Sequence, residues 1–486
     1  MNQAIRNSWI AAIAMFALIF GALSYVQVIG ADDLNANPLN KRATLQNYCN
    51  DRGSILVAGT PIAESVEGGS AACEFQRTYN QPELYAGLTG FFSRSYGATG
   101  LEFAMNDVLT GNSDQLFLDR IGQLFLGNQP HGASVELTVD PAIQQLAYDL
   151  IPEGQRGSIV VTNPKTGDIL AMVSKPSYDP NLIATQDTEA ERTNYTELNK
   201  IPGVNLNQSV SGPTGALLAP GSVFKLVDTA AALSSGKYNA DSVLENPAQM
   251  SFPGIDYKLP NYVGGTCYTR DTASFAFALQ QSCNTPFAAI ARDLGQDAIA
   301  DQAKKFGFGE GMGDQLELPY ARSFFPTEPL DAPALAQSAI GQRDVRATPL
   351  QINQMTSAIA NGGVQMSPNL VKAVRSPDLR VLDEPQPSQL RTSTTPDIAR
   401  QITEWMVSAV SQGIANGAAV NGVQVAGKTG TAELDDGTNN SWFTGFAPAN
   451  DPQVAVTIVM ENVDISTGAQ LTSPNAKKIF EAVLNK

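Results

Sequence analysis

Residues 217–233, LLAPGSVFKLVDTAAAL, form an apolar run with one serine, Ser222, and one lysine, Lys225, three positions apart. A proline and a glycine before the serine suit the start of a helix, which the following residues continue. Ser222 then lies in the first turn with Lys225 on the same face, and their Cβ atoms are about 5 to 6 Å apart. An amine at that distance can act as a base for the hydroxyl once burial lowers its pKa. The pattern predicts a serine nucleophile that a lysine activates.

Three short motifs point to this chemistry, but each also occurs elsewhere in the chain. The S-x-x-K, K-T-G and S-x-N spacings recur at 234–237, at 165–167, and at 367–369 and 473–475. The copy at 234–237 is expected at a helix end and the copy at 165–167 in a hairpin turn. The copies at 367–369 and 473–475 are expected in a loop and at a helix cap, respectively. By contrast, Ser282 and Asn284 stand between two apolar helix patterns, and Lys428 lies in an alternating strand pattern. Context therefore favours these three residues as partners of Ser222.

Strand patterns at both ends of the C-terminal part predict one antiparallel sheet with a helical subdomain between them. Residues 157–175 form a hairpin pattern around an Asn-Pro-Lys-Thr-Gly turn, and further strand patterns follow within 423–461. Asp140 is placed to cap a helix that starts at Pro141, and Ser473 to cap the closing helix. The expected fold class is α+β.

Composition excludes several classes of function. Of the 486 residues, 31 are Lys or Arg and 47 are Asp or Glu, and the net charge of −16 would be repelled by a phosphate backbone. No nucleic-acid partner is therefore expected. The one histidine, His131, excludes a multi-histidine metal site, and we expect it to be structural rather than part of a Ser-His-Asp triad. No metal or other cofactor is expected.

The N-terminal segment has the length and composition of a membrane anchor. Residues 9–30 carry no charge, and such a run can cross the roughly 30 Å hydrocarbon core as a helix. Arg6 precedes the run while Asp32 and Asp33 follow it, so residues 1–8 should stay in the cytoplasm and the bulk should lie outside. A cleaved signal peptide is the alternative, but its apolar region is usually about 7 to 15 residues long. We expect a single-pass protein of the cell membrane.

Four cysteines without C-x-x-C spacing favour two disulfides over a zinc or redox site in an exported chain. We expect Cys267 to pair with Cys283, its nearest cysteine in sequence, and Cys49 to pair with Cys73. The first bridge would tether the segment that holds Ser282. A small buried thiol is the alternative for Cys283.

Taken in order, Ser222-Val-Phe-Lys225, Ser282-Cys-Asn284 and Lys428-Thr-Gly430 resemble the three active-site motifs of penicillin-binding proteins and serine β-lactamases. Further stretches, among them RGSI, GLEF and NPKTGDILAMVS, extend the resemblance over nearly everything after residue 50. The chain is similar to class B penicillin-binding proteins, closest to the short actinobacterial form called penicillin-binding protein A. The resemblance implies an anchor at 9–30, a pedestal (dimerisation-like) domain at 31–145, and a transpeptidase domain with a β-lactamase-like fold at 146–486.

The resemblance implies a peptidoglycan D,D-transpeptidase that β-lactams target. Ser222 would attack the D-Ala-D-Ala carbonyl of a stem peptide while Lys225 takes its proton, and an amine from a neighbouring stem peptide would resolve the acyl-enzyme. Ser282 would relay protons and Asn284 would bind the donor amide. The resemblance implies a substrate-binding strand edge at Lys428, Thr429 and Gly430. It also implies an oxyanion hole formed by the backbone N–H groups of Ser222 and Thr431. Glu433 and Asp435 are expected to be surface residues.

Three other functions stay open at this point. A D,D-carboxypeptidase would share the acylation and use water for the second step, whereas a β-lactamase of class A would need a glutamate that no motif supplies here. A non-catalytic scaffold or sensor would not need complete motifs. A transpeptidase without a polymerase domain must receive glycan from elsewhere, and the resemblance implies a membrane glycosyltransferase of the SEDS family (RodA/FtsW-like) as partner.

Overall fold

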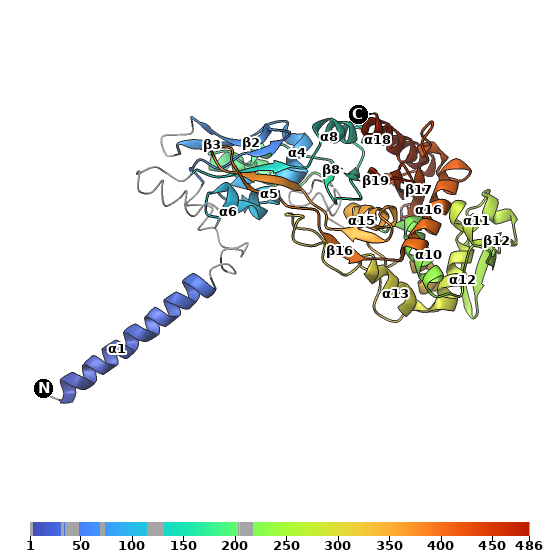
Figure 1. Cartoon of the computed structure of the whole chain (residues 1–486), viewed down its shortest axis with the longest axis horizontal. Helices are drawn as coiled ribbons and strands as arrows, with labels where there is room; N and C mark the ends of the chain where they lie inside the picture. Colours follow the sequence, from blue (N-terminus) through green and yellow to red (C-terminus); the bar gives the residue numbers. More distant parts are fainter. Residues whose placement is uncertain are drawn as a thin grey trace.

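The computed structural model describes residues 3–30, 34, 48–68, 73–113, 131–202, 204 and 217–485. An N-terminal helix lies apart from an elongated body, in which a smaller sheet domain is followed by a larger domain (Figure 1).

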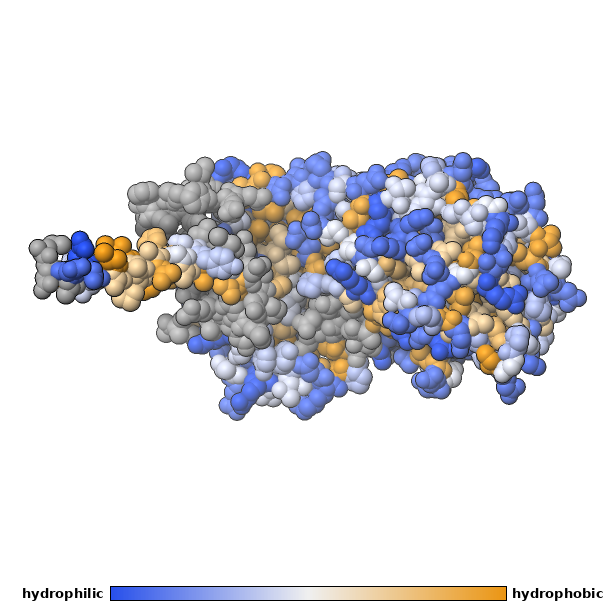
Figure 2. Space-filling view, turned by 90° about the horizontal axis from the view of Figure 1, so that it is seen from below, coloured by the Kyte–Doolittle hydropathy of each residue, from blue (hydrophilic) through white to orange (hydrophobic). Residues whose placement is uncertain are grey.

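The N-terminal helix α1 (Gln3–Ser24) continues as a short π-helical turn, η1 (Tyr25–Ile29). Residues 5–27 are long and apolar enough to cross a membrane, and none of the most apolar window is buried. Large side chains such as Phe16 and Leu18 are 73% and 75% exposed. Apolar residues lie along this helix in Figure 2. A long apolar stretch that no described part of the chain buries suits a lipid environment, so α1 is compatible with a single-pass membrane anchor.

The smaller domain is built on a six-stranded sheet of order β15-β14-β6-β1-β2-β3. The strands are β1 (Ile55–Val57), β2 (Thr60–Glu67), β3 (Phe75–Tyr79), β6 (Ser134–Leu137), β14 (Val371–Arg375) and β15 (Val381–Asp383). Only the β1–β6 pair is parallel. The domain also holds α4 (Pro82–Thr89), α5 (Gly100–Ala104), α6 (Asn106–Leu109), β4 (Phe92–Ser93) and β5 (Gly97–Ala98).

Two strands of this sheet come from the far end of the sequence. Strand β14 pairs with β6 and β15 pairs with β14, although both lie more than two hundred residues after β6 in the chain; they are the orange strands among blue and teal ones in Figure 1. Leu370 and Val371 are buried in the same apolar cluster as Ile55 and Val135. The sheet of the smaller domain is therefore completed by residues 371–383, so this domain is not formed by one contiguous stretch of sequence.

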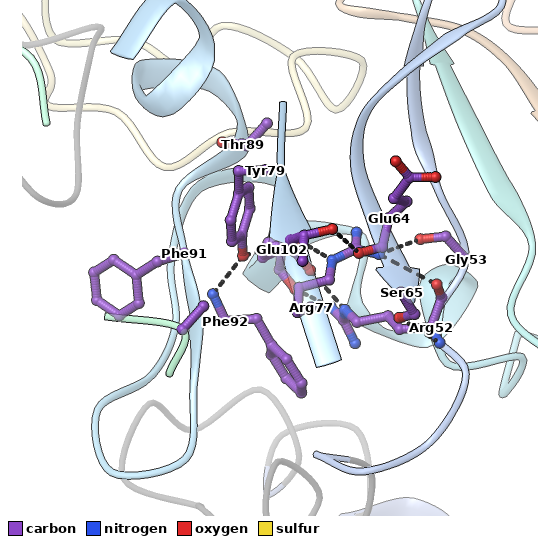
Figure 3. Close-up of polar contacts among 12 residues, drawn as sticks. Arg52, Gly53, Glu64, Ser65, Arg77, Tyr79, Thr89, Phe91, Phe92 and Glu102 are labelled. Atoms are coloured by element: carbon purple, nitrogen blue, oxygen red, sulfur yellow. Dashed lines mark hydrogen bonds and ion pairs between the residues drawn. The ribbon is translucent and has the colours of Figure 1, made fainter. Parts of the chain in front are cut away.

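A buried ion cluster fixes the strands and helices of the smaller domain to one another (Figure 3). The Glu102 carboxylate accepts hydrogen bonds from Arg52 Nε and Arg77 Nε, both at 2.6 Å, and from the Tyr79 hydroxyl at 3.3 Å. The Arg52 and Arg77 side chains are only 2% exposed and that of Glu102 is fully buried. Although burial opposes ionisation, Arg77 and Arg52 hold the pKa of Glu102 below its usual value.

Replacement of Glu102 is expected to destabilise the protein strongly. Glu102→Gln leaves two buried guanidinium groups without a counter-charge, and breaking a buried ion pair in this way costs about 3–5 kcal/mol. The free energy of unfolding of the detergent-solubilised chain, measured by denaturant titration, checks this value. Glu74→Gln, at an exposed position of the same domain, is the control and should leave the midpoint unchanged. Equal midpoints for the two variants would contradict a structural role for the cluster.

The larger domain is built on a five-stranded antiparallel sheet of order β17-β18-β19-β7-β8. Its strands are β7 (Gly157–Thr162), β8 (Ile169–Lys175), β17 (Ala426–Glu433), β18 (Asn439–Ala447) and β19 (Val454–Val463). Successive side chains point to opposite faces, and every residue of β7 and β18 is buried, so both faces of the sheet are covered. Helices α8 (Pro141–Asp149) and α18 (Ser473–Leu484) cover one face, and α15 (Pro349–Ala360) covers the other. The expected hairpin and the expected single sheet are confirmed.

The helical subdomain and the connecting segments complete this domain. The subdomain comprises α10 (Lys225–Ser234), α11 (Phe275–Gln280), α12 (Thr285–Leu294), α13 (Gln296–Lys305) and α14 (Ala332–Ala339). Three two-stranded sheets are also present: β9 (Val243–Glu245) with β12 (Thr272–Ser274), β10 (Gln249–Phe252) with β11 (Ile255–Pro260), and β13 (Val364–Met366) with β16 (Gln389–Thr392). The remaining helices are η3 (Pro180–Leu182), α9 (Thr188–Leu198), η4 (Gly221–Phe224), η5 (Thr266–Thr269), α16 (Pro396–Ser411), η6 (Asn416–Ala418) and α17 (Ile465–Leu471).

One of the two expected helix caps is confirmed and the other is wrong. Asp140 caps α8, and its side chain accepts hydrogen bonds from the N–H groups of Ala142 and Ile143. Ser473 is instead the first residue of α18, and Thr472 stands at the cap position without a side-chain cap bond. Helix α17 ends just before Thr472, whose backbone is therefore helical, whereas a side-chain cap needs an extended residue.

Candidate active site

Ser222 lies on a short 3₁₀ turn, η4, that leads directly into α10. In a 3₁₀ turn the side chains at i and i+3 are eclipsed, so Ser222 stands over Lys225. The sequence predicts an α-helical first turn at Ser222, whereas the structure has a tighter 3₁₀ turn there. Gly221 has φ of +55°, and a Cβ on it would come within 2.6 Å of the Thr431 carbonyl oxygen. Only glycine fits there, and it brings Ser222 against strand β17.

Lys225 is completely buried beneath this turn. Its Nζ donates to the Ser282 carbonyl oxygen at 2.7 Å and to Asn284 Oδ1 at 2.7 Å, and it lies 3.4 Å from Ser282 Oγ. Within the described residues, no hydrogen bond joins Lys225 to Ser222. The amine is thus held by the S-x-N segment.

The segment 281–284 between α11 and α12 presents Ser282 in a strained conformation. Ser282 has φ of +58°, a left-handed value that is uncommon for a residue with a side chain. The Cys283 N–H donates to the Ala278 carbonyl at 2.9 Å, and the Asn284 N–H donates to Asn261 Oδ1 at 2.7 Å. These bonds hold the turn and aim Ser282 Oγ toward β17. Such strain is typical of functional sites.

Asn261 is a supporting residue that sequence reasoning missed. It is fully buried, and its Oδ1 accepts from the N–H groups of both Asn284 and Thr285. Its Nδ2 donates to Asn246 Oδ1 at 2.8 Å. An asparagine in a loop, without a motif around it, gives no sequence signal for this contact.

Lys428 approaches Ser282 from the opposite side, on strand β17. Its side chain is 1% exposed, and its Nζ donates to Ser282 Oγ at 2.7 Å and to the Thr429 carbonyl oxygen at 2.8 Å. Burial lowers the pKa of Lys428 to about 7. Two lysines therefore flank one serine hydroxyl in the interior.

Burial, together with the neighbouring charge of Lys428, holds the pKa of Lys225 well below its usual value, although Asp228 opposes the shift. Burial likewise raises the pKa of Asp228, whose carboxylate oxygens have no hydrogen-bond partner among the described residues. The lowered pKa of Lys225 favours a neutral amine, and the raised pKa of Asp228 favours a neutral carboxyl. The neutral amine is the form of Lys225 that can accept a proton.

A cleft of about 530 Å³ opens above these groups. Ser222, Ser282 and Asn284 line it, together with Thr429, Thr431 and Glu433 on alternate positions of β17. Exposed apolar side chains at Tyr262, Val263, Ile414 and Ile465 also line it. The structure thus brings Ser222, Lys225, Ser282, Asn284 and Lys428 together at the base of one cleft.

The structure pairs both sets of cysteines as expected. Cys267 and Cys283 have Cα atoms 5.5 Å apart and are joined, as are Cys49 and Cys73 in the smaller domain. The first bridge ties η5, on the cleft wall, to the middle residue of the strained turn.

Removal of the Cys267–Cys283 bridge is expected to destabilise the larger domain. The Cys267→Ser, Cys283→Ser double variant should lose about 3 kcal/mol, the chain-entropy value for a loop of about this size. Thermal unfolding measures the loss, and non-reducing peptide mapping of the wild-type chain checks the pairing. A free Cys283 thiol in the native protein, or an unchanged melting temperature of the double variant, would contradict the tether.

The chance copies of the motifs lie away from this cleft. Ser234 ends α10, and Lys237 is exposed and pairs with Asp293 at 3.2 Å. Lys165 lies in the β7–β8 turn and pairs with Asp451. His131 is on the surface, with Nδ1 2.9 Å from Asp51.

The Ser222 hydroxyl, at the start of a helix and one turn from the buried amine of Lys225, has the requirements of a nucleophile in acyl transfer. The amine can take the hydroxyl proton. The helix N-terminus favours negative charge on oxygen. The edge of β17 can accept an extended peptide in the cleft.

Comparison with known proteins agrees with this chemistry. Residues 52–135 match the model of the penicillin binding protein A dimerisation domain. The peptidoglycan D,D-transpeptidase PbpA of Mycolicibacterium smegmatis is 37% identical over the full length of both chains. Penicillin-binding protein A from M. tuberculosis, solved as a penicillin G acyl-enzyme complex, is 36% identical and superposes with a TM-score of 0.81 over 89% of this chain and 99% of that one. Penicillin-binding protein 3 of the same organism, solved with aztreonam, is 25% identical with a TM-score of 0.71 over 90% of this chain and 96% of that one.

The decisive match covers the part of the chain that holds the cleft. Residues 157–485 match the penicillin binding protein transpeptidase domain, and Ser222, Lys225, Ser282, Asn284 and Lys428 all lie within them. Ser282, flanked by Lys225 and Lys428 at the edge of β17, and this match lead to one conclusion: the chain belongs to the penicillin-binding protein transpeptidase family.

Proposed function

We propose that the protein is a peptidoglycan D,D-transpeptidase that crosslinks stem peptides through an acyl-enzyme on Ser222. One observation carries the proposal: Lys225 and Lys428 both reach Ser282 Oγ, at 3.4 and 2.7 Å, beneath the cleft that Ser222 lines. The name of the M. smegmatis relative and the acyl-enzyme structures of the M. tuberculosis protein support it.

The first half-reaction transfers an acyl group to Ser222. Its Oγ attacks the carbonyl of the penultimate D-alanine while neutral Lys225 takes the hydroxyl proton. The peptide bond to the last D-alanine then breaks, and the amine of the leaving D-alanine receives a proton relayed from Lys225 through Ser282. Catalytic hydrogen bonds often tighten only in the substrate complex, so a Ser222–Lys225 bond is expected to form when the donor binds.

The second half-reaction releases the product. An amine of a neighbouring stem peptide attacks the ester carbonyl of the acyl-enzyme and loses a proton to Lys225. The new peptide bond forms, the ester bond breaks, and the Ser222 hydroxyl is restored. In both halves the backbone N–H groups of Ser222 and Thr431 stabilise the oxyanion. The close approach of Gly221 to the Thr431 backbone supports this placement, because it brings the two N–H groups to the same edge of the cleft.

Lys428, Thr429 and Gly430 form the strand edge that receives the donor, and Lys428 attracts its terminal carboxylate. Asn284 binds the donor amide. Asn284 Oδ1 accepts from Lys225 at 2.7 Å, and its Nδ2 donates one hydrogen to the Pro260 carbonyl oxygen at 2.9 Å. The second Nδ2 hydrogen is left to bind the substrate in the cleft that Asn284 lines.

Acylation by penicillin G is expected to slow as the pH rises above neutrality. Lys428 has a pKa of about 7, so its positive charge is present below that pH and is lost above it. The second-order acylation rate of the free enzyme should therefore fall between pH 7 and pH 9. The methyl ester of penicillin G, which has no carboxylate, is the control and should lack this decline. An identical pH profile for acid and ester would show that Lys428 does not attract the carboxylate.

Product analysis tests the proposed function. The purified chain is incubated with a pentapeptide donor and an amine acceptor, and the products are separated by liquid chromatography and identified by mass. We expect release of D-alanine together with a crosslinked product that depends on the acceptor. Release of D-alanine with hydrolysed donor alone would instead assign a D,D-carboxypeptidase, and absence of both products would contradict either enzyme.

We further propose that α1 anchors the protein with residues 1–8 in the cytoplasm and both domains outside. The pedestal at 31–145 and the transpeptidase domain at 146–486 then face the wall, where the anchor and pedestal bind a SEDS-family glycosyltransferase that supplies glycan. The exposed apolar surface of α1 and the match to a dimerisation domain support this proposal. Co-purification from membranes tests it. If a chain with an unrelated anchor co-purifies equally well, α1 takes no part in the contact.

A further inference from the structure

The cleft carries one carboxylate on its wall. Among the described residues that line it, Glu433 is acidic and none is a lysine, arginine or histidine. Glu433 ends β17 and is exposed, and no ion pair within the described part of the chain neutralises it. The sequence predicts a surface residue at this position. The structure agrees that it is exposed, and shows in addition that it faces the cleft.

The spacing along β17 places this carboxylate at a defined distance from the proposed reaction centre. Side chains on one face of a strand repeat every two residues, so Thr429, Thr431 and Glu433 face the cleft in a row. At about 3.3 Å per residue, Glu433 lies about 7 Å beyond Thr431 and about 13 Å beyond Thr429. The cleft-facing edge of β17 therefore ends in a carboxylate at Glu433, whereas Lys428 is buried at its other end beneath the cleft, on Ser282 Oγ.

We propose that Glu433 selects donor stem peptides that carry a positively charged amine on the residue just upstream of D-Ala-D-Ala. The inference rests on the proposed function, because that function fixes the direction of the donor. With its carboxylate at the Lys428 end and its scissile carbonyl at Thr431, the donor must continue along β17 toward Glu433.

The reach of the donor matches this distance. An extended peptide advances about 3.3–3.6 Å per residue, so 7 Å beyond the scissile carbonyl corresponds to about two residues, or to one residue with a long side chain. Every stem peptide that can act as an acceptor carries an amine, and the same stem peptide carries that amine when it acts as a donor. Glu433 would thus bind, on the donor, the group that is the nucleophile on the acceptor.

The test compares two donors that differ in one charge, Nα-acetyl-L-lysyl-D-alanyl-D-alanine and its Nα,Nε-diacetyl analogue. D-alanine release is measured as kcat/KM for each. The wild-type chain should prefer the free amine by about fivefold, the scale of an exposed ion pair, and the preference should shrink at high salt. Glu433→Gln should lose the preference and Glu433→Asp should keep part of it.

Asp435→Asn is the matched control, because Asp435 is an exposed carboxylate two residues further on that does not line the cleft. It should keep the wild-type preference. The inference is overturned if Glu433→Gln prefers the free amine as strongly as the wild type, if Asp435→Asn loses the preference too, or if the wild type shows none.

Acylation of the wild-type chain by penicillin G, measured in the same preparation, separates the two levels of the argument. If penicillin acylates Ser222 and both donors react equally, the selection by Glu433 is wrong while the proposed function stands. If neither penicillin nor either donor acylates the chain, the proposed function and the selection fall together.

Discussion

Ser222→Ala is expected to abolish covalent labelling by penicillin completely. Alanine has no oxygen to form the ester, and Ser282, another hydroxyl in the cleft, is held by Lys428 at 2.7 Å in a strained turn rather than at the start of a helix. Gel fluorescence after incubation with a labelled penicillin measures the loss. The substitution removes one half-exposed oxygen, so the melting temperature should stay close to the wild-type value.

Ser234→Ala is the matched control for this prediction. Ser234 also has a lysine three residues later, but it ends α10 and lies away from the cleft. Its variant should label at the wild-type rate. Persistent labelling of Ser222→Ala, or loss of labelling in Ser234→Ala, would show that the nucleophile has been assigned to the wrong serine.

Lys225→Ala is expected to slow acylation by about a thousandfold, within the range that a positioned general base supplies. Burial and the neighbouring charge of Lys428 hold the pKa of Lys225 well below its usual value, although Asp228 opposes this shift, and the lowered pKa favours the neutral amine that a base requires. The second-order rate of penicillin acylation is the measurement. Lys237→Ala, at an exposed lysine paired with Asp293, is the control and should react normally.

Lys225→Arg distinguishes a base from a fixed positive charge. Arginine stays protonated in proteins, so this variant keeps the charge and loses the ability to accept a proton. We expect it to be as slow as Lys225→Ala. Rescue of the rate by arginine would contradict the role of Lys225 as base, and a fall in melting temperature matching the loss of rate would point to a structural role instead.

The main parts of the site could be predicted because they depend on short-range geometry. Ser222 and Lys225 lie one turn apart, the S-x-N segment falls between two apolar helix patterns, and Lys428 lies in an alternating strand. Each local pattern fixes its own element, and the order of the three motifs removes the chance copies. The resemblance to a known family then supplied the roles.

Long-range contacts could not be predicted in the same way. Nothing in the sequence around β14 indicates that it pairs with β6, more than two hundred residues earlier, because its strand pattern is compatible with any sheet edge. The positive φ of Ser282 is imposed by tertiary contacts, including those made by Asn261. The prediction that Ser473 caps the closing helix is wrong for a related reason, because the preceding helix α17 sets the backbone conformation of Thr472.

The central claim is that Ser222 forms the acyl-enzyme, and mass spectrometry of the wild-type chain after incubation with penicillin G tests it most directly. Intact mass should rise by the mass of one penicillin, and peptide mapping should place the adduct on Ser222. An unmodified chain, or an adduct on Ser234, Ser282 or any other residue, would contradict the claim.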